Sequence, residues 1–524
     1  MRHKLHSLIF LLFGLSQAAA GATPDSLERK PRLGENIQYK AEVQISTGKG
    51  STPLWLNANK HGLSSLDSQN GYLRGSIIRP LLADSLHRWG MGYGLDVAVP
   101  YNYTSHIVVQ QAFAEIRWKY GLLTLGIKEQ PMQFKNDSLS SGSQTLGINA
   151  RPLPEVRLAL PEYWHIPGTR QWLGIKGHIS YGVSTDGTWQ EDFTKGHSGH
   201  SKRAIYHSKA GYVWVGNTKK FPLSIEMGLE MVCFFGGTRY DSRGNKTAVQ
   251  PDHNLHSFWN AFIPGGSDKS DGIYANVEGN HLGSWMLRLN YDMPRWRASL
   301  YADHYFEDHS QMFFLDYDGY PEGDDFMKKE EKRYFRYPLK DIMVGAEVEL
   351  KKCHWVRSIV LEYLYTKYQS GPIYHDTTPN MPDHLGGGDN YYNHASNSGY
   401  QHWGMVMGNP LYRSPLYNTD GTISVKNNRF VAVHGGISGQ PLAQLSYRLL
   451  ATWQRGWGTY GSPYVPPRRN MSVLLDVNYL FPKGWKAGIG IGADRGSILG
   501  DNAGVQLTVS KSGVFSFGKK KSTR

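Results

Sequence analysis

The sequence predicts an all-β fold, a transmembrane antiparallel β-barrel with long extracellular loops. Three observations predict it: an export signal, apolar and polar residues that alternate along most of the chain, and connections of alternating length. The composition agrees, because 32 Tyr, 15 Trp and 59 Gly supply strand and turn formers while only 40% of the residues are hydrophobic. A wall that meets lipid on one face and water on the other needs that balance.

The first 22 residues have the pattern of a secretory signal peptide. Arg2 and Lys4 precede an apolar run at residues 8–15, and small residues follow at 18–22. We expect cleavage before Thr23, since the small residues just before it suit signal peptidase. A retained N-terminal anchor is the alternative, but the apolar run is shorter than a membrane-spanning helix requires.

Residues 23–524 are predicted to form one barrel domain in the outer membrane. They contain no run of roughly 18 apolar residues, the length of a transmembrane helix, and no linker or change of composition divides them. Cys233 and Cys353 are the only cysteines, so no disulfide framework holds the fold.

The first expected strand shows the alternation most clearly. Between residues 36 and 46, Ile37, Val43 and Ile45 stand on the face opposite Glu42 and Gln44. The same division returns at residues 224–231, 285–292, 473–479 and 505–510. A soluble β-sandwich also alternates, but on the order of 16 to 19 such segments in one undivided chain favour a transmembrane barrel.

Aromatic residues and turns complete the expected wall. Rings near strand ends are candidates for the interfacial girdles of a barrel: Trp118 with Tyr120, Trp296 with Tyr305, and Tyr363 with Tyr365. Tight hairpins are predicted at residues 119–121 and 482–484. Long loops are predicted at residues 186–202, 238–272, 316–333 and 369–425.

The formal net charge of +13 favours acidic partners, such as acidic polysaccharide or the phosphates of lipopolysaccharide. Nucleic acid is not an expected partner, because the chain is exported and carries no nucleic-acid recognition motif.

Twenty-one histidines raise the question of a metal site. The densest polar group consists of Asp303, His304, Glu307, Asp308 and His309. Asp303 and His304 point to opposite faces of a strand that enters a loop, so we interpret this group as a solvated polar patch. Local motifs for zinc or serine-hydrolase chemistry are missing, so we predict no catalytic residue, no metal and no cofactor.

The loop at residues 383–416 combines aromatic rings with amide, carboxylate and imidazole groups. Sugars stack their C–H faces on such rings and exchange hydrogen bonds with the polar groups. An alternative is that the loop packs its own aromatics and plugs the barrel. The predicted polysaccharide-binding residues are Asp389, Tyr391, Tyr392, Tyr400, His402, Trp403 and Arg413.

Three motifs resemble the capsule assembly protein family called Wzi. The first reads Pro53-Leu54-Trp55-Leu56-Asn57-Ala58-Asn59, followed by Gly62. The second is the loop just described, which ends in Gly408-Asn409-Pro410-Leu411. The third runs from His434-Gly435-Gly436 through Tyr447-Arg448-Leu449-Leu450 and Thr452 to Gly458-Thr459-Tyr460. Tyr400 and Trp453 depart from the family's pattern, which has tryptophan and histidine at these places.

The resemblance implies a barrel of about 18 strands that acts without covalent chemistry, as a surface lectin that retains and organises exported capsule. Its implied partners are capsular or other surface polysaccharide, outer-membrane lipid and lipopolysaccharide. A porin or polysaccharide-export channel is the alternative, since Lys40, Glu42, Glu226 and Glu230 give the expected inner face a polar lining. A barrel hydrolase is a third possibility.

Overall fold

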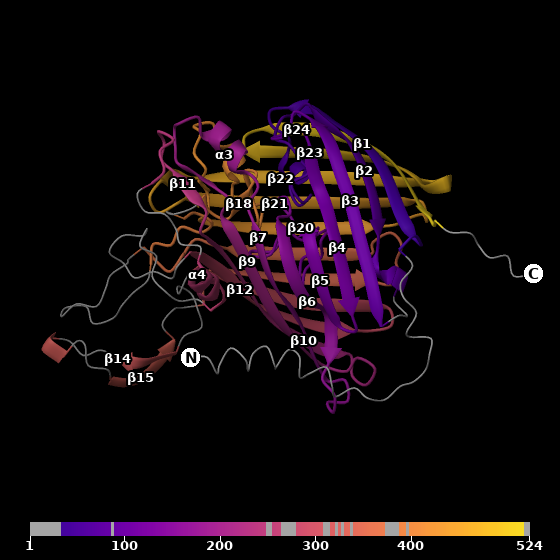
Figure 1. Cartoon of the computed structure of the whole chain (residues 1–524), viewed down its shortest axis with the longest axis horizontal. Coiled ribbons are helices and arrows are strands. Elements are labelled where there is room, and N and C mark those ends of the chain that lie inside the picture. The colour runs from indigo at the N-terminus through magenta and orange to yellow at the C-terminus, as the bar shows by residue number, and fades with distance from the viewer. Residues whose placement is uncertain are drawn as a thin grey trace, which may run out of the picture.

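In the computed structural model, eighteen antiparallel strands form one closed β-barrel (Figure 1). Each strand pairs with its neighbours in chain order, and the last strand pairs with the first over the whole length of the latter, from Ile37 to Lys49. The barrel strands are β1 (Ile37–Lys49), β2 (Asn70–Arg79), β3 (Trp89–Tyr101), β4 (Val108–Trp118), β5 (Gly121–Ile127), β6 (Pro154–His165), β7 (Leu173–Val183), β9 (Ile205–Val215), β10 (Leu223–Phe235), β12 (Asn280–Asp292), β13 (Trp296–Glu307), β16 (Ile342–Leu350), β17 (Ser358–Tyr365), β20 (Phe430–Gly439), β21 (Leu445–Gly458), β22 (Pro463–Phe481), β23 (Trp485–Gly496) and β24 (Asn502–Phe515).

The structure describes residues 33–84, 88–247, 254–263, 279–307, 315–319, 323–325, 330–335, 339–372, 387–394 and 398–517. The predicted signal peptide, together with Asp308 and His309, lies outside these residues. Among the residues described, no helix is long and apolar enough to cross a membrane.

The wall confirms the alternation read from the sequence. In β1, Val43 and Ile45 point outward and are 45% and 60% exposed, while Glu42 and Gln44 are buried inside the barrel. Large apolar side chains cover the outer face of the other strands in the same way. Burying these side chains in lipid removes their exposed area from water, so the protein is an outer-membrane β-barrel, as predicted.

The two ends of the barrel differ as expected. Two-residue and three-residue turns at residues 119–120 and 482–484 confirm the predicted hairpins. The predicted long loops extend from the opposite end, on the left in Figure 1, between β7 and β9, β10 and β12, β13 and β16, and β17 and β20. Because barrels of this class have short periplasmic turns and long external loops, the long-loop end faces the outside of the cell.

Short elements lie in these loops and in the connection between β1 and β2. The helices are α2 (Leu54–Asn57), α3 (Gly187–Thr194) and α4 (Leu255–Phe262). Three small two-stranded antiparallel sheets pair β8 (His200–Lys202) with β11 (Thr238–Tyr240), β14 (Leu315–Gly319) with β15 (Glu330–Phe335), and β18 (Gln401–His402) with β19 (Met405–Val406). The last two are hairpins, whereas β8 and β11 come from neighbouring loops.

One girdle assignment is wrong. Trp118, Tyr120, Trp296 and Tyr363 lie on the outer face and are exposed, but Tyr305 is fully buried inside the barrel. The physical reason is parity: Tyr305 shares its face of β13 with Asp303 and Tyr301, which are also buried, whereas Trp296 lies on the opposite face.

Candidate functional site

The interior of the barrel is occupied by three segments from the long-loop end, here called the plug: residues 50–69, residues 128–153, and residues 387–394 with 398–418. Their apolar side chains form one cluster with the inner wall, including Trp55, Leu139, Tyr392 and Tyr412. The middle segment adds polar side chains with almost no exposure, among them Ser141, Gln144 and Thr145. The plug alternative therefore describes the packing of the described part of this loop, residues 387–394 and 398–416.

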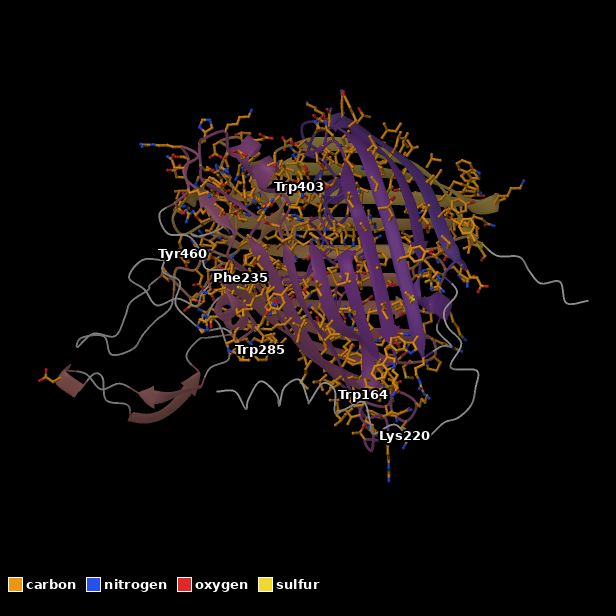
Figure 2. The ribbon with its side chains drawn as sticks, in the orientation of Figure 1. Trp164, Lys220, Phe235, Trp285, Trp403 and Tyr460 are labelled. Atoms are coloured by element: carbon orange, nitrogen blue, oxygen red, sulfur yellow. The ribbon has the colours of Figure 1, made fainter. Side chains whose placement is uncertain are left out.

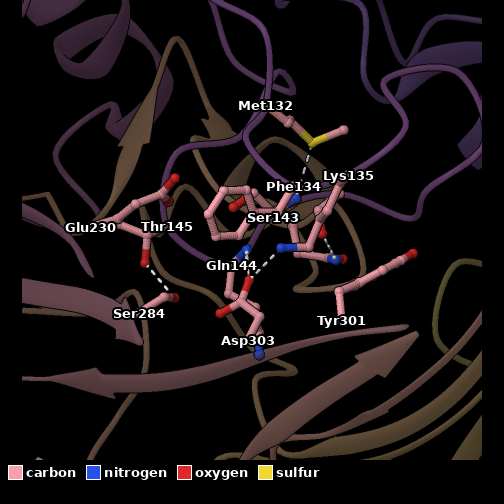
Figure 3. Close-up of polar contacts among 12 residues, drawn as sticks. Met132, Phe134, Lys135, Ser143, Gln144, Thr145, Glu230, Ser284, Tyr301 and Asp303 are labelled. Carbon is pink, nitrogen blue, oxygen red and sulfur yellow. Dashed lines mark hydrogen bonds and ion pairs between the residues drawn. The ribbon is translucent and has the colours of Figure 1, made fainter. Parts of the chain in front are cut away.

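Carboxylates of the inner wall hold the middle segment of the plug in place (Figure 3). Lys135 Nζ lies 2.7 Å from Asp303 Oδ2 on β13, and the backbone N–H of Leu146 donates to Glu230 on β10 at 3.1 Å. On β17, Glu362 accepts hydrogen bonds from the Ser140 hydroxyl and the Ser141 backbone N–H, at 2.6 and 2.8 Å. Charge-assisted bonds of this kind are the strong ones, so they fix the segment to three strands.

Asp303 and His304 do not form the solvated patch expected from the sequence. Asp303 is 0% exposed and His304 is 4% exposed. Asp303 faces the lumen, and there Lys135 of the plug neutralises its charge. No local pattern in β13 reveals this cation, because it comes from a distant segment of the chain.

The tyrosines of the loop rest on the middle segment. Tyr400 donates its hydroxyl proton to the Thr145 carbonyl at 2.7 Å, and Tyr412 donates to Gln144 Oε1 at 3.0 Å. Tyr392 donates to the Gln144 carbonyl. Each buried hydroxyl thus finds a partner, which removes the cost of burying it.

A directed chain of hydrogen bonds joins the first and third motifs. Trp55 Nε1–H donates to Thr452 Oγ1 at 3.0 Å, and His434 Nδ1 lies 2.7 Å from the same oxygen. His434 Nε2 lies 2.8 Å from the Leu139 carbonyl, which only accepts, so Nε2 carries the proton and Nδ1 accepts from the Thr452 hydroxyl. These motif residues therefore connect the plug to the wall by hydrogen bonds.

The seven predicted binding residues separate into two groups. Tyr391, Tyr392, Tyr400 and His402 are 0 to 1% exposed, so no ring face is free for a sugar in this arrangement. Asp389, Trp403 and Arg413 are partly exposed at the long-loop end. The role of all seven in sugar binding stays a prediction, and the three partly exposed residues are those that a polymer can reach without rearrangement.

Arg413 and Asp389 already hold the loop together. Arg413 donates from Nε to the Ile498 carbonyl at 3.2 Å and from Nη2 to the Tyr417 carbonyl at 2.7 Å. Asp389 accepts the Ser370 hydroxyl proton at 2.7 Å. Both residues therefore have a structural role, whatever else they bind.

Trp403 is presented by a strained turn beside α3 (Figure 2). With Gly404 it forms the two-residue turn of the β18–β19 hairpin, and both residues have positive φ, 55° and 79°. Glycine adopts this conformation freely, but tryptophan does so at a cost. The Trp403 backbone N–H donates to Asp186 at 3.0 Å, and the Arg151 guanidinium lies 4.5 Å from the centroid of the indole ring.

The structure of this chain is similar to that of Wzi from Escherichia coli, described as an outer-membrane carbohydrate-binding β-barrel involved in group 1 capsule assembly. The TM-score is 0.53 at 14% sequence identity, over 93% of this chain and 86% of that one. OprD of Pseudomonas aeruginosa matches with a TM-score of 0.43 at 8% identity, over 95% of this chain and 100% of that one. No family model and no curated protein matches the sequence.

At such identities the likeness to Wzi concerns the fold. It agrees with the eighteen-stranded wall and with the outer-membrane location. Membership of the Wzi family stays a prediction from the three motifs.

The lumen remains polar on the side of the plug that faces the short turns. A cavity of about 450 Å³ lies there, lined by charged side chains that include Lys40, Glu42, Arg74, Arg448 and Asp476. Glu226 and Glu230 also face inward and are buried. The predicted polar inner face is therefore present, but the plug stands between this cavity and the long loops.

A pH dependence follows from Asp341, which anchors the loop next to β16. Its carboxylate accepts from the backbone N–H groups of Tyr368 and Gln369 at 3.0 and 2.7 Å, and from the Tyr391 hydroxyl at 3.1 Å. Burial raises its pKa to about 6. Because this pKa is higher in the folded arrangement than in the unfolded chain, protonation of Asp341 stabilises the folded arrangement. The stabilisation is complete below about pH 4 and is lost as the pH rises through 6.

We therefore expect backbone amides near Tyr368 and Tyr391 to become about tenfold better protected between pH 7 and pH 5, after correction for intrinsic exchange. Hydrogen–deuterium exchange of the full chain in detergent measures this. Asp341→Asn, which cannot ionise, should lose the pH dependence. An equal gain in that variant would show that another group is responsible.

Proposed function

We propose that this chain binds and organises exported capsular polysaccharide at the cell surface, by non-covalent contacts and without enzymatic turnover. Support comes from the outer-membrane barrel, from the three motifs that resemble the Wzi family, and from the surface that the plug presents to the outside. The observation that carries the proposal is the geometry of Trp403.

Trp403 fits the role of a sugar-stacking residue. Strained backbone is retained where the surrounding structure over-determines it, and it concentrates at functional sites. Here Asp186 fixes the backbone of the turn and Arg151 lies over the ring, while the indole remains partly exposed. A fixed aromatic ring loses little conformational entropy when a sugar packs against it.

Cations around the barrel mouth add attraction for an acidic polymer. Arg429 lies 3.6 Å from the ring centroid of Tyr460, and Arg468 lies 4.2 Å from that of Tyr464. Figure 2 shows Tyr460 at the long-loop end. Rings beside guanidinium groups offer both a stacking face and a positive charge, which suits sugars that carry carboxylates.

The test is the affinity of the purified full-length barrel for capsular polysaccharide, measured by surface plasmon resonance. We expect Trp403→Ala to weaken binding by about fivefold or more, since one stacking contact contributes on the order of 1 kcal/mol. Trp403→Phe keeps a ring and should retain most of the affinity.

Trp296→Ala is the matched control, because Trp296 is a partly exposed ring on the outer wall near the short turns. It should leave the affinity unchanged. If Trp403→Ala binds as tightly as the unmodified protein while its barrel remains folded, Trp403 is not a binding residue. If no polysaccharide binds to the unmodified protein, the proposed function is wrong.

A further inference from the structure

Three arginines form an outward-facing group near the long-loop end of the wall: Arg455 on β21, Arg469 on β22 and Arg495 on β23, here called the arginine cluster. Arg455 and Arg469 stand directly opposite each other in the β21–β22 register. Arg495 stands opposite Met471, two residues from Arg469 on the same face, so it is their diagonal neighbour. Directly paired side chains are about 5 Å apart and diagonal ones about 7 to 8 Å.

The arginine cluster begins where the apolar outer band ends. Going up the β21–β22 pair, Leu449 faces Leu475, then Trp453 faces Met471, and the next outward pair is Arg455 with Arg469. The four apolar side chains are 40 to 48% exposed, as lipid-facing residues are. Each residue rises about 3.3 Å along a strand, so the guanidinium groups lie at the level of the lipid headgroups.

No described carboxylate neutralises the arginine cluster. Within the described residues, none of the ion pairs includes Arg455, Arg469 or Arg495. The Nε atom of Arg455 is covered and lacks a hydrogen-bond partner there. Like charges placed directly opposite on adjacent strands destabilise a sheet, so the protein alone gains nothing from this arrangement.

A tryptophan and a lysine extend the site. Arg455 lies 5.0 Å and Lys367 Nζ lies 4.5 Å from the ring centroid of Trp457, two residues beyond Arg455 on the same face. Tryptophan prefers the interface between lipid and water. The site thus combines planar cations with an interfacial ring.

We propose that the arginine cluster binds the phosphate groups of a phosphorylated glycolipid in the outer leaflet. One guanidinium group can donate two parallel hydrogen bonds to the oxygens of one phosphate. Three guanidinium groups at the same height in the membrane therefore suit a headgroup that carries more than one phosphate. The acyl chains then lie along Leu449, Trp453 and Met471. A loop-bound polysaccharide approaches from above the mouth, whereas these side chains point sideways into the membrane. None of the residues changed in the polysaccharide test belongs to the arginine cluster, so the two proposals can fail separately.

The experiment compares full-length, delipidated barrels by native mass spectrometry in the presence of bisphosphorylated lipid A. Arg455→Gln, Arg469→Gln and Arg495→Gln in one chain should weaken lipid binding by about tenfold or more. The matched control changes three exposed cations at the short turns: Arg88→Gln, Arg295→Gln and Lys220→Gln. It should bind as the unmodified protein does.

Dephosphorylated lipid A should bind the unmodified protein as weakly as lipid A binds the triple variant. Arg469→Gln alone, a change at an exposed side chain, keeps the test possible if the triple variant does not fold. Unchanged binding in the arginine variants, equal loss in the control, or equal binding of the dephosphorylated lipid would each overturn the proposal. Complete displacement by millimolar inorganic phosphate would also overturn it, because it would identify a site for free anions.

Discussion

Replacing residues 128–153 by an Asn-Gly turn is expected to convert the barrel into an open channel. Ile127 and Pro154 are direct partners in the β5–β6 pair, so a two-residue hairpin can join them without disturbing the wall. The excision removes the segment on which Tyr392, Tyr400 and Tyr412 rest. Because barrels of 16 to 18 strands without a filling leave an aqueous pore, conductance in planar bilayers should rise by about tenfold or more.

The matched control removes a loop that is not one of the three plug segments. Val183 and Ile205 are also direct partners, so residues 184–204, with α3, can be replaced by the same turn. This variant should conduct as little as the unmodified protein. Steady, large conductance in the unmodified protein would instead favour the porin alternative and contradict the occluding role of the plug.

Lys135→Met is expected to destabilise the barrel by about 3 to 5 kcal/mol, because it leaves Asp303 charged and unpaired in the interior. The two side chains are 1% and 0% exposed and lie 2.7 Å apart. Unfolding by urea in detergent, followed by the mobility shift of folded barrels on gels, measures the loss.

Two further variants separate this effect from simple loss of a lysine. Lys135→Met combined with Asp303→Leu removes both charges and should recover most of the stability, since an apolar pair of similar size is often as stable as the ion pair. Lys351→Met breaks a pair with Asp292 in which both side chains are about one-third exposed. It should cost less than about 1 kcal/mol. A double variant as unstable as the single one would show that unpaired charge is not the cause.

The wall could be predicted from the sequence because the alternation within each strand shows which of its side chains face lipid and which face the lumen. Val43 and Ile45 on one face of β1, against Glu42 and Gln44 on the other, locate lipid and lumen without knowledge of any other strand. Counted from Trp296 along β13, parity alone places Tyr305 inside the barrel.

The plug could not be predicted in the same way. Ser140, Ser141, Ser143, Gln144 and Thr145 are 0 to 2% exposed, yet they read as a solvated loop. The polar groups of a segment that fills a polar lumen form hydrogen bonds with the polar wall. Such a segment can therefore be buried without being rich in apolar residues. Its partners Glu230, Asp303 and Glu362 lie on distant strands, and pairing between them has no local signal.

The candidate site was only partly predictable for a related reason. The ring-rich pattern of the loop that contains Trp403 predicts a binding region, but that pattern does not say which rings face outward. The hydrogen bonds of Tyr392 and Tyr400 to the middle segment decide this, and they join residues more than 240 positions apart.

The same long separations determine when the interior can form during folding. The partners of residues 128–153 follow 84 residues later at Glu230, 168 at Asp303, 222 at Glu362 and 295 at His434. Contacts so distant in the chain make folding slow, since many residues must be ordered before the first of them forms. The middle segment therefore acquires its partners one after another as β10, β13, β17 and β20 fold, and its polar groups are fully satisfied only late in folding.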